Sequence, residues 1–140
     1  ANFMTEIPPN TTEPTGPRAK CLLADDDEIS QAIVEQILQS VGFIDLEIAP
    51  DGLKALDHCM TQKFDLLIVD RKMPHINGDR LIRHLRASRN PNTETPMILF
   101  SASTGSELKE LGAFCPADLI LSKPINATEF LRTVQLILRP

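Results

Sequence analysis

The sequence predicts an α/β fold: a doubly wound parallel sheet of five strands, with five helices on its two faces. Short, continuously apolar runs alternate along the chain with longer segments whose apolar residues recur every three or four positions. Continuous apolar runs are typical of strands that helices cover on both faces. Connections long enough to hold a helix favour parallel strands joined by right-handed crossovers. The length agrees, because 140 residues suffice for one domain with one full core.

The first predicted strand is the apolar run from Lys20 to Ala24. A helix follows, with Asp27 as its amino-terminal cap and Gly42 as its stop. Its predicted buried stripe consists of residues at intervals of four, with two apolar neighbours beside them: Ile29, Ile33, Ile37 and Val41, flanked by Val34 and Leu38.

Residues 46–49 predict a weaker second strand, because Glu47 interrupts its apolar residues. We therefore expect it at an edge of the sheet. The Asp51-Gly52 pair predicts a turn into the second helix, whose apolar stripe is Leu53, Leu56 and Met60. The third strand is a five-residue apolar run that ends at Asp70 and leads into Arg71-Lys72-Met73-Pro74.

The second half of the chain continues the alternation. After Gly78 a helix carries Leu81, Ile82 and Leu85 and stops before Pro91, and residues 96–100 form a strand that ends at Ser101. A short helix is expected over residues 106–111 and the last strand over residues 119–121. The final helix starts at about residue 127 and presents Phe130, Val134, Ile137 and Leu138.

Composition excludes several classes of function. A net charge of −5 and the absence of Trp and Tyr argue against direct binding of nucleic acid. The three cysteines are far apart and match no metal-binding or disulfide spacing, which favours a reducing, cytoplasmic location. No apolar run is long enough to span a membrane. Residues 1–17 are polar and Pro-rich and read as a flexible tail or linker, which leaves residues 18–140 as the domain.

The chemistry-bearing residues follow the ends of the predicted strands. Asp25 and Asp26, Asp70, Ser101 and Lys123 would all meet at one edge of a parallel sheet. Clustered carboxylates repel one another, and a hard divalent cation such as Mg²⁺ relieves that repulsion. Lys123 supplies positive charge for a phosphoryl group. Asp70, at the centre, is then a nucleophile that can form an aspartyl-phosphate.

At these residues the chain resembles the receiver domain of bacterial two-component response regulators. The resemblance covers residues 20–139. Its motifs are the acidic pair Asp25-Asp26 after the first strand, Asp51-Gly52, Asp70-x-x-Met73-Pro74 with Gly78 following, Ser101-Ala102 and Lys123-Pro124. Each motif is weak alone, but five in this order are highly specific. The resemblance implies a flavodoxin-like, CheY-like sheet with strand order 2-1-3-4-5.

The resemblance also implies a role for each site residue. Asp70 is the phosphoacceptor; Asp26, Asp70 and the backbone carbonyl of Lys72 are direct Mg²⁺ ligands, and Asp25 is a ligand through water. Ser101 and Lys123 are the residues that close on the phosphoryl group. The expected donor is a sensor histidine kinase or a histidine phosphotransfer protein. The signal would pass to an effector, an output domain or a second copy of the chain, and the domain would catalyse only its own phosphorylation and dephosphorylation.

The sequence departs from the family pattern at Ile120, where the fifth strand commonly carries a Tyr or Phe. Rotation of an aromatic ring therefore cannot report phosphorylation here. This departure favours an alternative, a pseudo-receiver that binds partners without phosphorylation, although the intact acidic residues oppose it. A second alternative is a hydrolase of the haloacid dehalogenase type. Lys72 opposes it, because such a hydrolase needs a second Asp at this position. Lys72 also predicts an effect on the lifetime of the aspartyl-phosphate.

Overall fold

The computed structural model describes residues 18–139, which form one five-stranded parallel sheet flanked by five helices. The strand order is β2-β1-β3-β4-β5, so the predicted architecture is confirmed. The second predicted strand does lie at an edge of the sheet. The strands are β1 (Ala19–Ala24), β2 (Ile44–Ala49), β3 (Leu66–Asp70), β4 (Met97–Ser101) and β5 (Leu119–Ser122).

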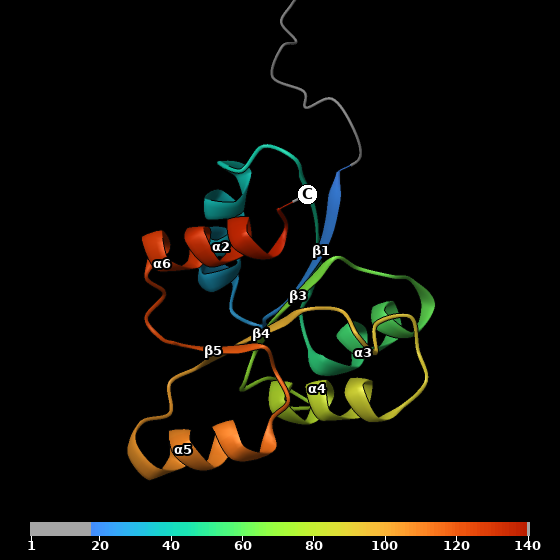
Figure 1. The fold of residues 1–140 in the computed structure, drawn as a ribbon, viewed down its shortest axis with the longest axis vertical. Coiled ribbons are helices and arrows are strands. Elements are labelled where there is room, and N and C mark those ends of the chain that lie inside the picture. Colours follow the sequence, from blue (N-terminus) through green and yellow to red (C-terminus); the bar gives the residue numbers. More distant parts are fainter. Residues whose placement is uncertain (1–17, 140) are drawn as a thin grey trace, which may run out of the picture.

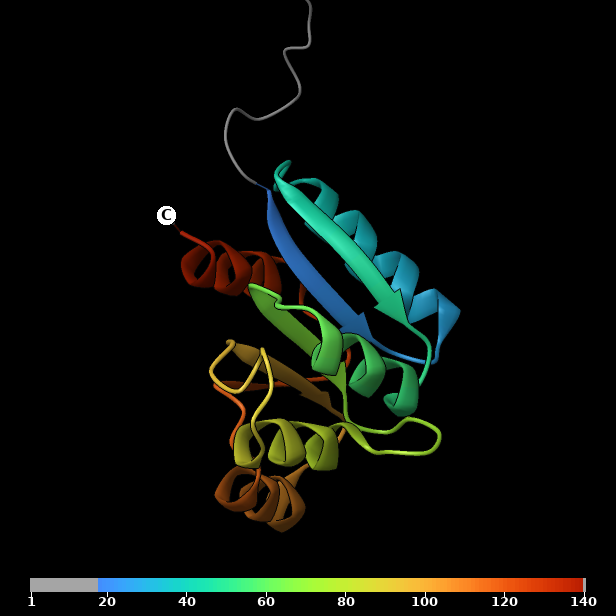
Figure 2. The same cartoon turned by 90° about the vertical axis from the view of Figure 1, so that its right-hand side faces the viewer.

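The helices cover both faces of the sheet, as Figures 1 and 2 show. On one face, Val34 and Leu38 of α2 join Phe130 and Val134 of α6 in a buried apolar cluster. A second cluster holds buried residues of α3, α4 and α5 on the opposite face. The helices are α2 (Glu28–Gln39), α3 (Gly52–Thr61), α4 (Gly78–Ala87), α5 (Gly105–Phe114) and α6 (Ala127–Ile137).

The register of the central strands fixes the edge that carries the site. Ala24 of β1 pairs with Val69 of β3, so the residues that follow them, Asp25 and Asp70, come out side by side. Every residue of β3 and of β4 is buried. Burial on both faces explains why these strands are continuously apolar up to their last residue.

Two predicted helix stripes are only partly confirmed: Val34, Leu38 and Ile37 of α2 and Leu56 of α3 pack into the core, but other predicted members do not. In α2 the buried residues are Val34 and Leu38, whereas Ile29 is 70% and Ile33 44% exposed. A step of four residues turns about 40° past one full helical turn, so a long run at that interval winds off the buried face. In α3, Ala55 and Cys59 face the core and the predicted Leu53 and Met60 are largely exposed. The α4 stripe of Leu81, Ile82 and Leu85 is confirmed.

Smaller differences concern where elements end. Helix α2 ends at Gln39, and Gly42, with φ +87°, belongs to the turn that leads into β2. Helix α5 is longer than the predicted segment 106–111. The predicted tail, residues 1–17, lies outside the described part of the chain. Within residues 18–139, no helix combines the length and the apolar character that crossing a membrane requires.

Candidate functional site

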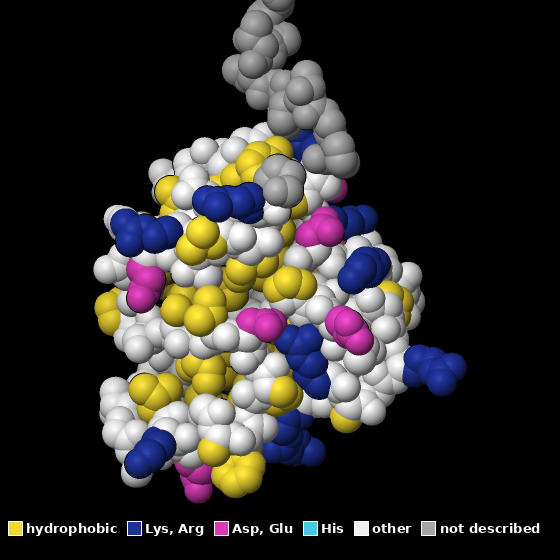
Figure 3. All heavy atoms as spheres, in the orientation of Figure 1, with side chains coloured by type: hydrophobic (Ala, Val, Ile, Leu, Met, Phe, Trp, Pro, Cys, Tyr) yellow, Lys and Arg dark blue, Asp and Glu magenta, His cyan; other side chains and the backbone are white. Residues whose placement is uncertain are grey.

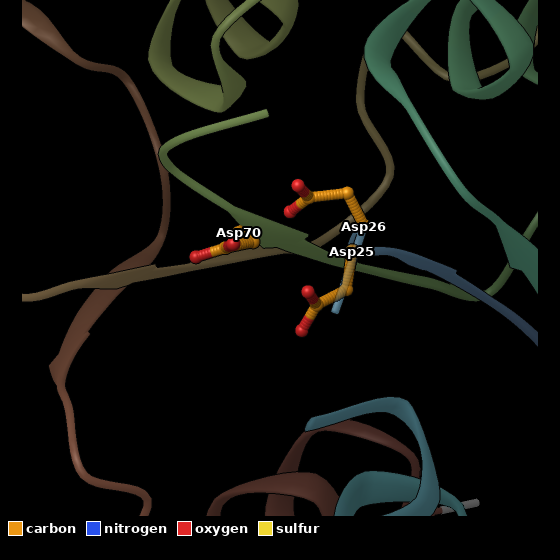
Figure 4. A group of neighbouring side chains, drawn as sticks. All are labelled: Asp25, Asp26 and Asp70. Carbon is orange, nitrogen blue, oxygen red and sulfur yellow. The ribbon is translucent and has the colours of Figure 1, made fainter. Parts of the chain in front are cut away.

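Three carboxylates meet at the carboxyl edge of the sheet. Asp25 and Asp26 follow β1 and Asp70 ends β3, and one oxygen from each lies within 4.8 Å of the others. Asp25 is 3% and Asp70 6% exposed, whereas Asp26 is exposed to solvent. Figure 4 shows the three side chains extending to the same side from the two neighbouring strand ends. The predicted acidic cluster is therefore assembled in the fold.

Lys123 brings one positive charge to this cluster. Its Nζ lies 2.7 Å from Oδ1 of Asp70, and its backbone N–H donates to the carbonyl oxygen of Ser101 at 3.0 Å. Lys123 directly follows β5, which pairs with β4. Its ammonium therefore reaches across the end of β4 to the carboxylate at the end of β3.

Burial raises the pKa of both inner carboxyl groups. For Asp70 the main cause is desolvation, against which the hydrogen bond and the charge of Lys123 act. For Asp25 the main cause is again desolvation; the hydrogen bond from the Asp27 N–H lowers the pKa, and the negative charge of Asp70 raises it. Holding these groups ionised therefore costs free energy in the folded protein.

A divalent cation fits this arrangement. One ammonium offsets only one of three carboxylates whose oxygens converge. The donors are all oxygens, which suits a hard cation of the Mg²⁺ type rather than a softer metal. Asp26 and Asp70 could hold such a cation directly and Asp25 through water. The backbone carbonyl of Lys72, the fourth predicted ligand, belongs to the loop directly after Asp70, where the Lys72 side chain is exposed.

Asp27, the third acidic residue of the run, has a different task. Its Oδ2 accepts from the backbone N–H and from the hydroxyl of Ser30, at 3.0 and 2.8 Å. It therefore caps α2, as predicted. The hydrogen bond from the Ser30 hydroxyl is the largest cause of its lowered pKa. The backbone N–H of Asp27 donates to Oδ1 of Asp25 at 2.9 Å, so the cap also orients a site carboxylate.

Ser101 lies at the predicted strand end but is not bonded to Asp70. Its side chain is 2% exposed, and its Oγ donates to Oγ of Ser103 at 2.8 Å. Ser103 in turn accepts from Nη1 of Arg71 at 2.5 Å. Sequence reasoning missed Arg71 and Ser103. The only local signals were an arginine beside Asp70 and a second hydroxyl two residues after Ser101.

The comparisons with known proteins agree with this geometry. The family model for the response regulator receiver domain matches residues 21–135. The chain belongs to this family. The transcriptional regulatory protein CpxR of Escherichia coli (strain K12) is 37% identical over 121 residues, which are 86% of this chain and 49% of CpxR. The sensor protein EvgS of Escherichia coli O157:H7 is 34% identical over 105 residues, which are 75% of this chain and 8% of EvgS.

Solved structures of receiver domains have the same fold. The CheY4 chemotaxis response regulator of Vibrio cholerae has a TM-score of 0.76 at 31% identity, and the match covers 86% of this receiver domain and 99% of that chain. The receiver domain of the sensor histidine kinase PA1611 from Pseudomonas aeruginosa PAO1 has a TM-score of 0.76 at 25% identity, with 85% and 96% covered. In that protein a magnesium ion is coordinated in the active site cleft.

The receiver domain spans about half the length of CpxR and a small part of EvgS. Response regulators and a sensor protein are thus both among its relatives. The alternative of a pseudo-receiver finds no support in the site, because Asp25, Asp26, Asp70 and Lys123 are together. The individual roles of these residues stay predictions.

Proposed function

We propose that this receiver domain accepts a phosphoryl group on Asp70 from a phosphohistidine of a sensor kinase or of a phosphotransfer protein. The observation that carries the proposal is the placement of Asp70: nearly buried, 2.7 Å from an ammonium and flanked by two further carboxylates. A carboxylate so placed is positioned as a nucleophile, and the positive charge of Lys123 neutralises the group that it receives.

The proposed transfer moves a phosphoryl group from an imidazole nitrogen to a carboxylate oxygen. A carboxylate oxygen of Asp70 forms a bond to phosphorus while the bond from phosphorus to the imidazole nitrogen breaks, and the electron pair stays on that nitrogen. Hydrolysis ends the signal: water attacks phosphorus, the acyl-phosphate bond breaks, inorganic phosphate leaves and the carboxylate is regenerated. A bound Mg²⁺ would supply further charge stabilisation to the phosphoryl oxygens. The domain acts catalytically only on itself.

The effect of the added charge would appear at a distant face. Phosphorylation replaces the single negative charge of one carboxylate by a phosphoryl group of roughly −2, next to the loop that joins β4 to α5. Figure 3 shows apolar side chains exposed on the side of the molecule where α5, β5 and α6 lie. Phe114, Leu119 and Leu136 are 65%, 40% and 58% exposed. This face is the proposed contact for an effector, an output domain or a second copy of the chain.

Incubation with acetyl phosphate and Mg²⁺, followed by intact mass measurement, tests the proposal. The wild-type domain should gain the mass of one phosphoryl group, and Asp70→Asn should gain none. Asp57→Asn is the matched control, because Asp57 is an exposed carboxylate on α3 outside the site; it should behave as wild type. A chelator should prevent the gain. An unmodified wild-type protein, or a modified Asp70→Asn variant, would contradict the proposal.

A further inference from the structure

A continuous series of hydrogen-bonded side chains leads from Ser101 away from the acidic cluster. Oγ of Ser101 donates to Oγ of Ser103 at 2.8 Å and accepts from the backbone N–H of Ser103 at 3.0 Å. Nη1 of Arg71 donates to the same Ser103 Oγ at 2.5 Å. Ser101 and Ser103 are buried, so no solvent competes with these bonds. The hydroxyl that the family pattern assigns to the phosphoryl group is thus engaged elsewhere.

Arg71 extends this series to two helices. Its Nη1 lies 3.6 Å from Oε2 of Glu107, in the first turn of α5, and its Nε lies 3.7 Å from Oδ1 of Asp79, in the first turn of α4. Nε of Arg71 and Oδ1 of Asp79 are buried without a hydrogen-bond partner. These ion pairs are longer than hydrogen bonds. The guanidinium is therefore anchored firmly to Ser103 and only loosely to the two helices.

The hydrogen bond that Ser101 donates to Ser103 and a hydrogen bond that it donates to a phosphoryl group exclude each other. A serine hydroxyl carries one hydrogen and can donate only one hydrogen bond with it. If Ser101 donates to a phosphoryl oxygen on Asp70, it can no longer donate to Ser103. Ser103 Oγ then keeps the hydrogen bond from Arg71 and loses the one from Ser101, and its rotation would move the guanidinium that contacts Glu107.

We propose that Ser103 and Arg71 are positioning residues that hold the Ser101 hydroxyl in the unphosphorylated state. When Ser101 leaves Ser103, the movement of Arg71 would reach α5 through its contact with Glu107. The proposal rests on the proposed function, since a phosphoryl group on Asp70 is what draws Ser101 away. It supplies a route to α5 that needs no aromatic ring at position 120, where this chain has Ile120.

The first test measures how tightly the site binds beryllofluoride, a phosphoryl mimic, with Mg²⁺ present, from amide NMR spectra. Ser103→Ala removes the competing acceptor. We therefore expect its apparent Kd to be lower than that of wild type by about three- to tenfold, the equivalent of one hydrogen bond. Ser106→Ala, which removes an exposed hydroxyl from α5, is the control and should match wild type. A purely structural role for Ser103 would not tighten binding, so an unchanged or weaker affinity overturns the proposal.

The second test follows hydrogen–deuterium exchange in α5 with and without beryllofluoride. In wild type, binding should change the exchange of residues 105–114. Arg71→Gln and Glu107→Gln should still bind the mimic, but the exchange of α5 should no longer respond. Glu107 is 60% exposed, so its variant keeps the test valid if Arg71→Gln fails to fold. Glu110→Gln is the control, because Glu110 lines the same surface pocket as Arg71 and Glu107, whereas the ion pairs of Arg71 are with Asp79 and Glu107.

The outcomes separate the two proposals. A wild-type protein that neither binds beryllofluoride nor gains mass from acetyl phosphate would refute the proposed function and this inference with it. A wild-type protein that does both, together with variants of Arg71 and Glu107 whose α5 responds as in wild type, would refute the inference alone.

Discussion

Asp25 and Asp70 stand at the ends of two neighbouring strands, whereas Ser101 and Ser103 lie where β4 gives way to a loop. The first pair is placed by the parallel register of β1 and β3 in the middle of the sheet. Ser101 is likewise placed by strand pairing, with Ser122, but its hydroxyl is held by side-chain hydrogen bonds through Ser103 to Arg71. Arg71 forms a long ion pair with Glu107, which is largely exposed. Main-chain pairing inside a core is rigid, whereas a side-chain network whose outer members, Arg71 and Glu107, reach the surface can rearrange at a lower cost.

The two regions therefore differ in what they can contribute. We call Asp25, Asp26 and Asp70 the acidic or rigid half of the site, and Ser101, Ser103 and Arg71 the hydroxyl half. The acidic half keeps its geometry, which a site that binds a cation and positions a nucleophile requires. The hydroxyl half has a second set of partners within reach, which a switch requires. Rigid and adjustable parts meet at Asp70 and Arg71, which are adjacent in sequence and serve different halves.

The largest effect should come from disturbing the backbone of the rigid half. A Cβ at Gly78 would collide with the carbonyl oxygen of Asp70 and the side chain of Val69. No rotamer change can move a backbone carbonyl, so we expect Gly78→Ala to lower the free energy of unfolding by about 1–3 kcal/mol. Urea unfolding followed by circular dichroism measures this change, since the chain has no Trp or Tyr for fluorescence.

Gly112→Ala is the matched control for Gly78→Ala. Gly112 lies inside α5, with no atom within 4 Å of the added Cβ. There the substitution should raise the free energy of unfolding by about 0.5–1 kcal/mol, because alanine is the better helix former. Equal stability of the two variants would contradict the view that the edge at Asp70 is the tightly packed part.

The contrast between the halves also explains what the sequence could predict. The strands ending at Asp70 and Ser101 were predicted nearly to the residue, because continuous apolar runs record burial on both faces. Parallel topology then brought Asp25, Asp26, Asp70 and Lys123 to one edge. These are consequences of local pattern and chain direction, which a single sequence contains.

The network of Arg71 could not be predicted in this way. Arg71 and Ser103 are 32 positions apart, and their contact depends on the direction of two side chains beyond their strands. The predicted faces of α2 and α3 were wrong in part, for a similar reason. Several helix faces were apolar enough to be buried, and the choice of Ala55 and Cys59 over Leu53 follows from packing against the sheet.

The cost of ionising the buried carboxyl groups of the rigid half predicts a smaller effect, a dependence of the free energy of unfolding on pH. The carboxyl pKa values of Asp25 and Asp70 are raised in the fold, so the folded state binds more protons than the unfolded state just above the ordinary carboxyl pKa of about 3.9. In that range the free energy of unfolding therefore falls as pH rises, until both groups are ionised in the folded protein.

Mg²⁺ should reverse this loss at neutral pH. At ten times its Kd a cation that binds only the folded state adds about 1.4 kcal/mol. Thermal unfolding of wild type with and without Mg²⁺ measures this gain, and Asp25→Asn should reduce it. Asp57→Asn, outside the site, should leave it intact. A stability that is the same with and without Mg²⁺ at neutral pH would show that the acidic half is not a cation site.

The smallest predicted effect lies at the boundary between the halves, in the side chain of Lys72. This side chain is exposed two residues after Asp70, and we expect it to lie next to the path that water takes to a phosphoryl group there. If its length shields that path, Lys72→Ala should shorten the lifetime of the aspartyl-phosphate about threefold, a barrier change of about 0.6 kcal/mol. Loss of radiolabelled phosphate with time measures the lifetime.

Lys72→Met separates length from charge in this prediction. Methionine retains most of the apolar stem without the ammonium, so a shielding role should leave the lifetime of Lys72→Met close to that of wild type. A shortened lifetime in both variants would instead assign the effect to the positive charge, which would act on the phosphoryl oxygens. An unchanged rate of dephosphorylation in Lys72→Ala would show that neither the length nor the charge of Lys72 influences the lifetime. The lifetime would then be set by the residues of the two halves alone.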